Sequence, residues 1–272
     1  MSSFSEEWLR LRFPADKKAR NKRLDKLFSR HILRFCETQS TVRIHDLAAG
    51  SGASLKALLP HLVQCQEQLS WCFYDNDPKL LAVSKEIAQR EALSISPIIC
   101  DLNIPEFFQT HSLVPAVTSS AFFDLVSESW IELLATYLLG VGSTALFSLT
   151  IDGRYELSPP HAFDTQVMFA VRQHQQKNKG FGPALGCEAA AFMIECFNKV
   201  GFTVLTGQSD WLLDYHDNQL QQELIQGWYS AALQMGLGES TLEVWRAFRL
   251  AALSKQESKI MLGHCDILIN PN

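Results

Sequence analysis

A glycine-containing segment, DLAAGSG at residues 46–52, is the first place where the residue types indicate ligand binding. It follows an apolar run typical of a strand and precedes a helical pattern. Glycine allows the backbone to come close to a ligand. The first N–H groups of a helix lack partners within the helix and lie at its positive dipole end. The segment therefore predicts a site for a carboxylate or a phosphate.

The next apolar run ends in an acidic residue, Asp75. In a strand–helix–strand unit, an acid at the end of the second strand is placed to hydrogen-bond a ribose diol. Pro78 then opens a helix, as proline does at a first turn. Asp77 precedes it and is interpreted as the cap of that helix. The spacing thus predicts a ligand that carries a ribose.

A dinucleotide site is the obvious alternative, and Leu55 disfavours it. The dinucleotide fingerprint GxGxxG needs a small third residue so that helix and strand approach closely. Leu55 occupies that position and is too bulky for this contact. The glycine spacing therefore favours the methionine end of S-adenosylmethionine over a pyrophosphate.

Through roughly residues 40–150 the chain resembles the class I (Rossmann-like) S-adenosylmethionine-dependent methyltransferases. DLAAGSG is similar to their first motif, with Ala48 in place of the first glycine. Asp75 resembles their ribose-binding acid. Asp101 resembles the acid that bonds the adenine amino group, with Leu102 beside the ring. The run 122–127 is similar to their fourth strand, whose end faces the transferred methyl group.

The resemblance implies an enzyme with S-adenosyl-L-methionine as its cofactor and without a required metal. The cofactor-binding residues that it implies are Asp46, Ala48, Gly50, Ser51, Gly52, Asp75, Asn76, Asp101, Leu102 and Ser127. Four further segments resemble a bacterial subfamily of these enzymes, without naming an acceptor. They are WLxLRxPAD at 8–16, KGFGPALG at 179–186, SDW at 209–211 and GHxD at 263–266.

Methyl transfer of this kind requires a nucleophile aligned with the bond that breaks. A base is needed for a hydroxyl or a protonated amine, but not for a carboxylate. The candidate catalytic residues are His174, Glu128 and Asp152. His174 is favoured as the base, since histidine titrates near neutrality; a surface histidine is the alternative interpretation.

The candidate substrate-binding residues are Trp130, Arg154, Arg172 and Phe181. The two arginines suit an acidic substrate, or they are merely solvated. Trp130 suits stacking on a substrate, or packing in the core. His264 and Asp266 alternate on the last predicted strand and are interpreted as a structural hydrogen-bonding pair.

The elements that would position these residues alternate between strand and helix. Expected strands are 42–47, 69–74, 95–100, 122–126, 144–149, 202–206 and 260–269. Expected helices are 53–66, 78–92, 188–200, 218–234 and 241–254, after a helical segment from 5 to about 35. This alternation predicts an α/β fold, Rossmann-like and doubly wound. The sheet would be mostly parallel and seven-stranded, with helices on both faces and an α-helical and irregular cap.

We expect a single methyltransferase domain over 1–272. Residues 1–38 would form an N-terminal helical cap and 39–151 the cofactor-binding half. Residues 152–187, long, polar and rich in proline and glycine, would form a lid over the acceptor. Residues 188–272 would complete the sheet.

The net charge and the cysteine content limit the classes of protein to which the chain could belong. The net charge of −5 excludes a protein whose whole surface binds nucleic acid, although a local basic patch stays open. The seven cysteines form no CxxC pair and no zinc spacing, which indicates reduced thiols and a cytoplasmic protein. The uncharged stretch 133–151 is interpreted as a helix end, a glycine turn and a buried strand, with no membrane association.

The leading hypothesis is methyl transfer to a small-molecule acceptor, by an oxygen or nitrogen nucleophile. An RNA methyltransferase is an alternative supported only by the basic cluster 17–26, which is otherwise a solvated helix face. A catalytically inactive methyltransferase-like scaffold is a third. Gly50, Gly52, Asp75 and Asp101 argue against it, because a scaffold has no need of them. The oligomeric state stays open.

Overall fold

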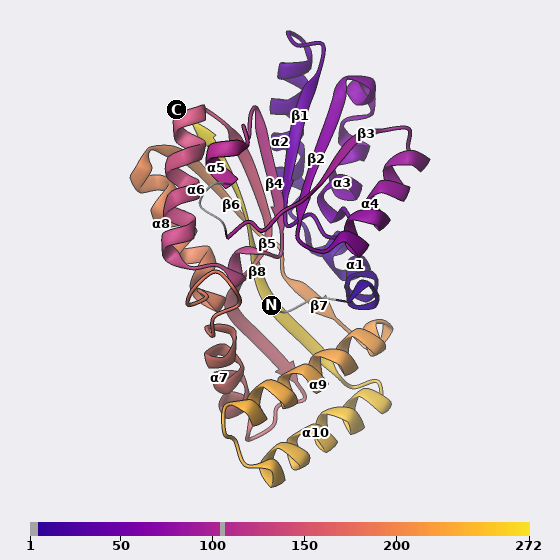
Figure 1. The fold of residues 1–272 in the computed structure, drawn as a ribbon. Coiled ribbons are helices and arrows are strands. Elements are labelled where there is room, and N and C mark those ends of the chain that lie inside the picture. Colours follow the sequence, from indigo (N-terminus) through magenta and orange to yellow (C-terminus); the bar gives the residue numbers. More distant parts are fainter. Residues whose placement is uncertain (1–4, 104–106) are drawn as a thin grey trace.

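A computed structural model of the chain describes residues 5–103 and 107–272. Within these residues, eight strands form one sheet in the order β3-β2-β1-β4-β5-β8-β6, and β7 pairs with β8 beyond this path (Figure 1). The strands are β1 Val42–Leu47, β2 Leu69–Asp75, β3 Ser94–Ile99, β4 Ala116–Ser120, β5 Thr144–Ser158, β6 Phe202–Gln208, β7 Trp211–Leu213 and β8 Lys259–Pro271.

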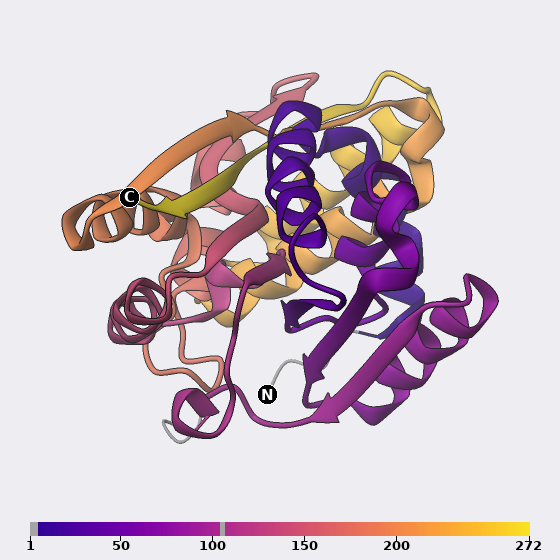
Figure 2. The same cartoon turned by 90° about the horizontal axis from the view of Figure 1, so that it is seen from above.

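Helices cover both faces of the sheet (Figure 2). One apolar core joins α2, α3 and α4 to one face, and another joins α5, α6 and α8 to the other. The helices are α1 Glu6–Ala19, α2 Lys22–Cys36, α3 Ala53–Leu58, α4 Pro78–Arg90, α5 Phe107–Thr110, α6 Glu128–Val141, α7 Asp164–Gln175, α8 Ala189–Val200, α9 Asn218–Gln234 and α10 Glu239–Ser254.

The strand order places ligand-binding loops together. Strands β3, β2, β1, β4 and β5 run parallel, and β8 is antiparallel to both β5 and β6. The order reverses at β1, which lies between β2 and β4, and such a reversal opens a crevice at the carboxyl ends of the strands. The expected Rossmann-like, mostly parallel sheet is confirmed. It has eight strands rather than seven, because the short β7 adds to β8.

The fourth strand was predicted at the wrong place. The strand is β4, and residues 123–125 of the expected strand 122–126 form a 3₁₀ turn. The polar Thr118 and Ser119 are buried in β4 because their hydroxyls donate to Asp46 Oδ1 and to the Leu47 carbonyl. Phe122 and Phe123 pack against Trp130 of α6. Phe122 and Phe123 are therefore buried in the core but do not form a strand of the sheet.

The region 152–186 was expected to be irregular, but its first part is regular. β5 continues to Ser158 and pairs there with the beginning of β8. Helices α7, α9 and α10 pack around this extension at the lower end of the molecule in Figure 1, in a third apolar core. The predicted helix 53–66 is also shorter, since α3 ends at Leu58 and two 3₁₀ helices follow. Pro60 lacks the N–H that a continuing helix needs.

Other sequence expectations match the structure. The stretch 133–151 is the end of α6, a turn with Gly142 at φ 69°, and the first half of β5. All seven cysteines are free. Among the described residues, no helix combines the length and apolar character that crossing a membrane requires.

Candidate functional site

The loop between β1 and α3 has a backbone that favours glycine. Gly50 has φ 51° and Gly52 has φ 78°, in the left-handed region that L side chains rarely adopt. The Ala49 N–H donates to the Tyr74 carbonyl of β2, which fixes the loop against the neighbouring strand. A Cβ on Gly50 would lie 3.4 Å from Leu9 Cδ1 of α1. The loop is therefore covered closely by the N-terminal helix.

Asp75, at the end of β2, is tied to this loop. Its Oδ2 accepts the Gly50 N–H at 2.8 Å, and its Oδ1 accepts the Asp77 N–H at 2.9 Å. Burial raises the pKa of Asp75. Asp77 accepts the Lys79 N–H at 2.8 Å and caps α4, as its sequence position predicted. Each Asp75 oxygen retains capacity for a further donor.

Asp101 and Leu102 follow β3 and face the same crevice. The Asp101 Oδ1 accepts the Asn103 N–H at 2.9 Å, and a carboxylate can accept further donors from a ligand. The Leu102 carbonyl accepts Trp130 Nε1–H at 2.8 Å. Trp130 itself is buried within an aromatic cluster that includes Phe122 and Phe181. It therefore supports the cavity wall from behind.

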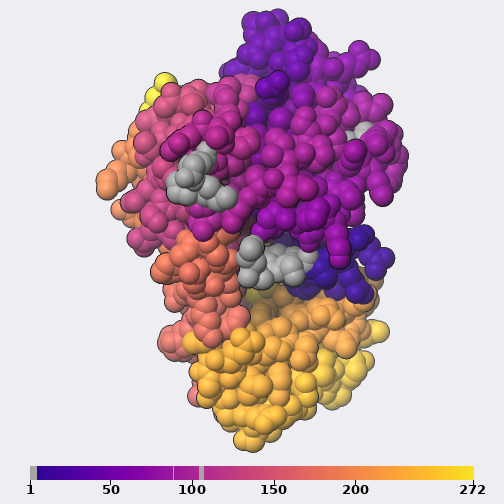
Figure 3. All heavy atoms as spheres, viewed as in Figure 1, coloured from indigo at the N-terminus to yellow at the C-terminus, as the bar shows by residue number. Residues whose placement is uncertain are grey.

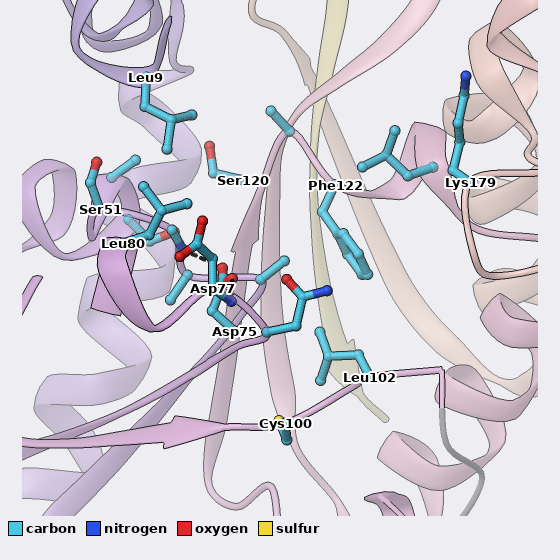
Figure 4. A pocket seen from close by; sticks show the side chains of 18 of the residues that line it. Leu9, Ser51, Asp75, Asp77, Leu80, Cys100, Leu102, Ser120, Phe122 and Lys179 are labelled. Atoms are coloured by element: carbon cyan, nitrogen blue, oxygen red, sulfur yellow. Dashed lines mark hydrogen bonds between the residues drawn. The ribbon is translucent and has the colours of Figure 1, made fainter. Parts of the chain in front are cut away.

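One cavity of about 490 Å³ joins these elements (Figure 4). Of the cofactor-binding residues implied by the resemblance, it is lined by Ala48, Gly50, Ser51, Asp75, Asn76, Asp101 and Leu102. Asp46, Gly52 and Ser127 are not among its lining residues. Ser127 caps α6 by accepting the Trp130 N–H. The cavity thus follows the carboxyl ends of β1, β2 and β3.

Asp46 lies buried beneath the loop. It is 1% exposed, and its Oδ1 accepts the Thr118 hydroxyl at 2.9 Å. Its Oδ2 has no hydrogen-bond partner among the described residues, and burial raises the pKa of Asp46 to about 7. This carboxyl group therefore supports the loop without reaching the cavity.

The other end of the cavity is formed by helix α1 and by the loop before α8. Their lining residues are Leu9, Arg12, Phe13, Asp16, Lys179, Gly180 and Phe181. Figure 3 shows the indigo residues of α1 between the purple part of the chain and the orange-to-yellow helices α9 and α10. Phe181 was a candidate from the sequence, whereas the four α1 residues were not. The WLxLRxPAD motif was the signal that pointed to them.

A polar cluster holds α1 over the cavity. Arg12 Nε donates to Asp16 Oδ2 at 2.9 Å, and Trp211 Nε1 donates to Asp16 Oδ1 at 3.0 Å. The Arg12 guanidinium carbon lies 4.9 Å from the centre of the Trp211 ring, in cation–π contact. The helix is thus fixed to β7 beside the cavity.

The candidate catalytic residues do not line this cavity. His174 lies on α7, where its Nε2 is 3.0 Å from Gln234 Oε1, and partial burial lowers its pKa. Glu128 is exposed in the first turn of α6. Asp152 accepts from the Arg154 guanidinium and lines a second, open cavity of about 520 Å³ together with Arg154 and Arg172. The structure therefore separates these candidates from the loop and from Asp75.

The alternating pair on β8 has structural partners. Asp266 is fully buried and accepts backbone N–H groups of Leu149 and Asn21, both at 2.8 Å. His264 Nδ1 donates to the Leu262 carbonyl, and its ring lies against Trp211. Burial lowers the pKa of His264 to about 4. The two residues bond to the backbone rather than to each other.

No family model and no curated protein sequence matches this chain. Solved structures do resemble it. The cyclopropane synthase MmaA2 from Mycobacterium tuberculosis is 10% identical, with a TM-score of 0.47, over 85% of this chain and 79% of the other. The YcgJ protein from Bacillus subtilis is 11% identical, with a TM-score of 0.45, over 90% and 99%. An O-methyltransferase family protein from Burkholderia thailandensis is 12% identical, with a TM-score of 0.42, over 87% and 55%.

Proposed function

We propose that this chain is an enzyme that transfers a methyl group from S-adenosylmethionine to a small-molecule acceptor with an oxygen or nitrogen nucleophile. The supporting observation is the single cavity that joins the loop 48–51, Asp75 and the pair Asp101–Leu102. These residues follow three adjacent strands, so their order suits the methionine, ribose and adenine parts of one extended ligand.

The residues present fit such a ligand. The Asp75 carboxylate can accept both ribose hydroxyls beyond its two backbone donors. Leu102 and Phe122 offer apolar surface for a purine ring, and Asp101 offers an acceptor for its amino group. Leu55 is fully buried in the core between α3 and the sheet. That burial agrees with the preference for this cofactor over a dinucleotide.

Bound S-adenosylmethionine supplies a methyl group that is already activated for displacement. The chain then has to align the acceptor and exclude water. Phe13 and Phe181 supply further apolar surface in the cavity. Loop 179–181 is the part of the proposed lid 152–187 that reaches it. Its position supports the division of the domain into a cap, a cofactor half and a lid.

The cavity lining bears on which residue could act as a general base. His174, Glu128 and Asp152 stay proposals, and each is weakened because it is not among the residues that line the cavity beside the loop 48–51. Asp16 is the carboxylate at the acceptor end, and Arg12 and Trp211 hold it in place. If the substrate accepts the methyl group on a carboxylate oxygen, no base is needed. If it accepts on a hydroxyl, the hydroxyl proton would pass to Asp16 or to water.

Thermal unfolding tests the cofactor. S-Adenosylhomocysteine at one hundred times its Kd should stabilise the protein by about 2.7 kcal/mol. For a chain of this size, that corresponds to roughly 5 to 10 °C in Tm. NAD should give no shift, and a shift with NAD alone would favour a dehydrogenase. No shift with either ligand would remove the proposal.

A labelled-methyl assay then tests the acceptor. The protein is incubated with methyl-labelled cofactor and either a metabolite extract or total RNA, and the labelled product is identified by mass. Label in a small molecule is expected. Label in RNA would favour the RNA methyltransferase, and cofactor binding without any label would favour the scaffold.

A further inference from the structure

The outer face of α2 carries an unbalanced positive charge. Between residues 17 and 36 every exposed charged side chain is basic; they are Lys17, Lys18, Lys22, Arg23, Lys26, Arg30 and Arg34. The single acid in this stretch, Asp25, is fully buried and pairs with the buried Arg20 at 2.8 Å. Among the described residues, no exposed carboxylate within 17–36 neutralises these cations.

The helical period places these cations in a line. Lys22, Lys26, Arg30 and Arg34 recur every four residues and so share one face of α2. At 1.5 Å per residue the line is about 18 Å long. The opposite face, with Leu24 and other apolar residues, is buried against the sheet. The lengthwise row of charge thus points away from the core.

The positive charge of this row contrasts with the net negative charge of the rest of the chain. Residues 17–36 contain eight basic residues and one acid, or +7, so a total of −5 leaves −12 for the remainder. Among the described residues, the one ion pair of the exposed row is a 3.9 Å approach of Lys22 to the buried Asp25. A uniformly solvated surface would not concentrate the positive charge in this way.

We propose that this basic face of α2, continued by Lys17 and Lys18 at the end of α1, binds the phosphate backbone of a nucleic acid. A row of cations neutralises successive phosphates and releases condensed counterions. An anionic membrane is the other polyanionic surface, but a helix that binds in its interface inserts an apolar face. The apolar face of α2 is already buried in the core.

The basic face also continues on the helix that covers the cavity. Lys17 directly follows Asp16, which lines the acceptor end of the cavity. A bound strand would therefore pass close to the cavity rim. The inference does not depend on the proposed function, because none of the seven exposed cations lines the cavity.

Fluorescence anisotropy with a labelled 20-nucleotide RNA tests the proposal on the full-length protein. Binding should be measurable at 50 mM salt, with log K falling linearly with log salt. The variant K22E/K26E/R30E should lose most of this binding. Removing three phosphate contacts should reduce the slope by about 2, at roughly 0.7 for each contact with a single strand.

The control variant K199E/K255E/K259E changes the net charge equally, at three exposed lysines elsewhere. It should bind RNA nearly as the unsubstituted protein does. Both variants should keep the Tm of the parent and its affinity for S-adenosylhomocysteine, which separates this inference from the proposed function. Absence of RNA binding at 50 mM salt would overturn the proposal. Equal loss in both variants, or tighter binding to phosphatidylserine vesicles than to RNA, would do so too.

Discussion

Replacing Asp75 by alanine should weaken cofactor binding through the ribose. In the structure each Asp75 oxygen accepts one backbone N–H, and the proposed function adds ribose hydroxyls as further donors. A hydrogen bond to a charged group contributes about 1.5–3 kcal/mol. The loss of one such contact should therefore raise the Kd of S-adenosylhomocysteine roughly 10- to 100-fold.

The same substitution also frees the Gly50 N–H, so the loop itself could shift. Titration calorimetry with a 2′,3′-dideoxy analogue separates the two effects, because the analogue lacks the hydroxyls. The two ligands and two proteins form a double-mutant cycle. Asp75→Ala should weaken S-adenosylhomocysteine strongly and the analogue little.

Asp77→Ala is the matched control, since it removes a neighbouring carboxylate that lines the same cavity but caps α4. It should cost about 1 kcal/mol of stability and leave the preference for the ribose hydroxyls unchanged. Equal weakening of both ligands by Asp75→Ala would show that Asp75 acts only through the loop. An unchanged Kd would refute the ribose contact altogether.

Three further predictions concern stability and closure. Because burial raises the folded-state pKa of Asp46 to about 7, the folded protein holds a proton that the unfolded chain releases near pH 4. Stability should therefore fall as the pH rises from 4 to 7, by up to about 1.4 kcal/mol per pH unit, and Asp46→Asn should flatten this slope in urea unfolding. Arg249→Ala, which removes the fully buried partner of Asp164, should cost about 3–5 kcal/mol, and Arg246→Ala at the surface less than about 1 kcal/mol; similar losses in both would contradict the burial argument. Trp211→Phe removes the indole donor to Asp16. It should raise the KM for the acceptor and leave the Tm nearly unchanged; an unchanged KM would mean that α1 does not close the acceptor end.

The residues at the carboxyl ends of β1, β2 and β3 could be predicted from the sequence because their signals are local. The loop 46–52, Asp75 and Asp101 each lie at or just after the end of a strand, and the ends of adjacent parallel strands necessarily meet at one edge of the sheet. The capping role of Asp77 likewise depends on its immediate neighbours. The positions of these residues at successive strand ends were therefore enough to predict that they lie close together.

The prediction of the fourth strand failed for a physical reason. A strand buried on both faces was expected to be apolar, but Thr118 and Ser119 are buried with their hydroxyls bonded to β1. Those partners lie far away in the sequence, so no local pattern contains them. The apolar Phe122 and Phe123 satisfied the pattern, yet they pack on α6.

The sequence by itself determined the fold class, the glycine loop and the acids that follow β2 and β3. Only the tertiary structure decided that α1 covers that loop with Leu9 and lines the same cavity with Arg12 and Asp16. His174 and Arg172 lie outside this cavity. The reason is the pairing of the second half of β5 with β8, which carries α7 away from the cavity and brings Trp211 to α1. Contacts between distant segments set the part of the cavity that α1 lines, and the order of neighbouring strands set the part that the loop 46–52 lines.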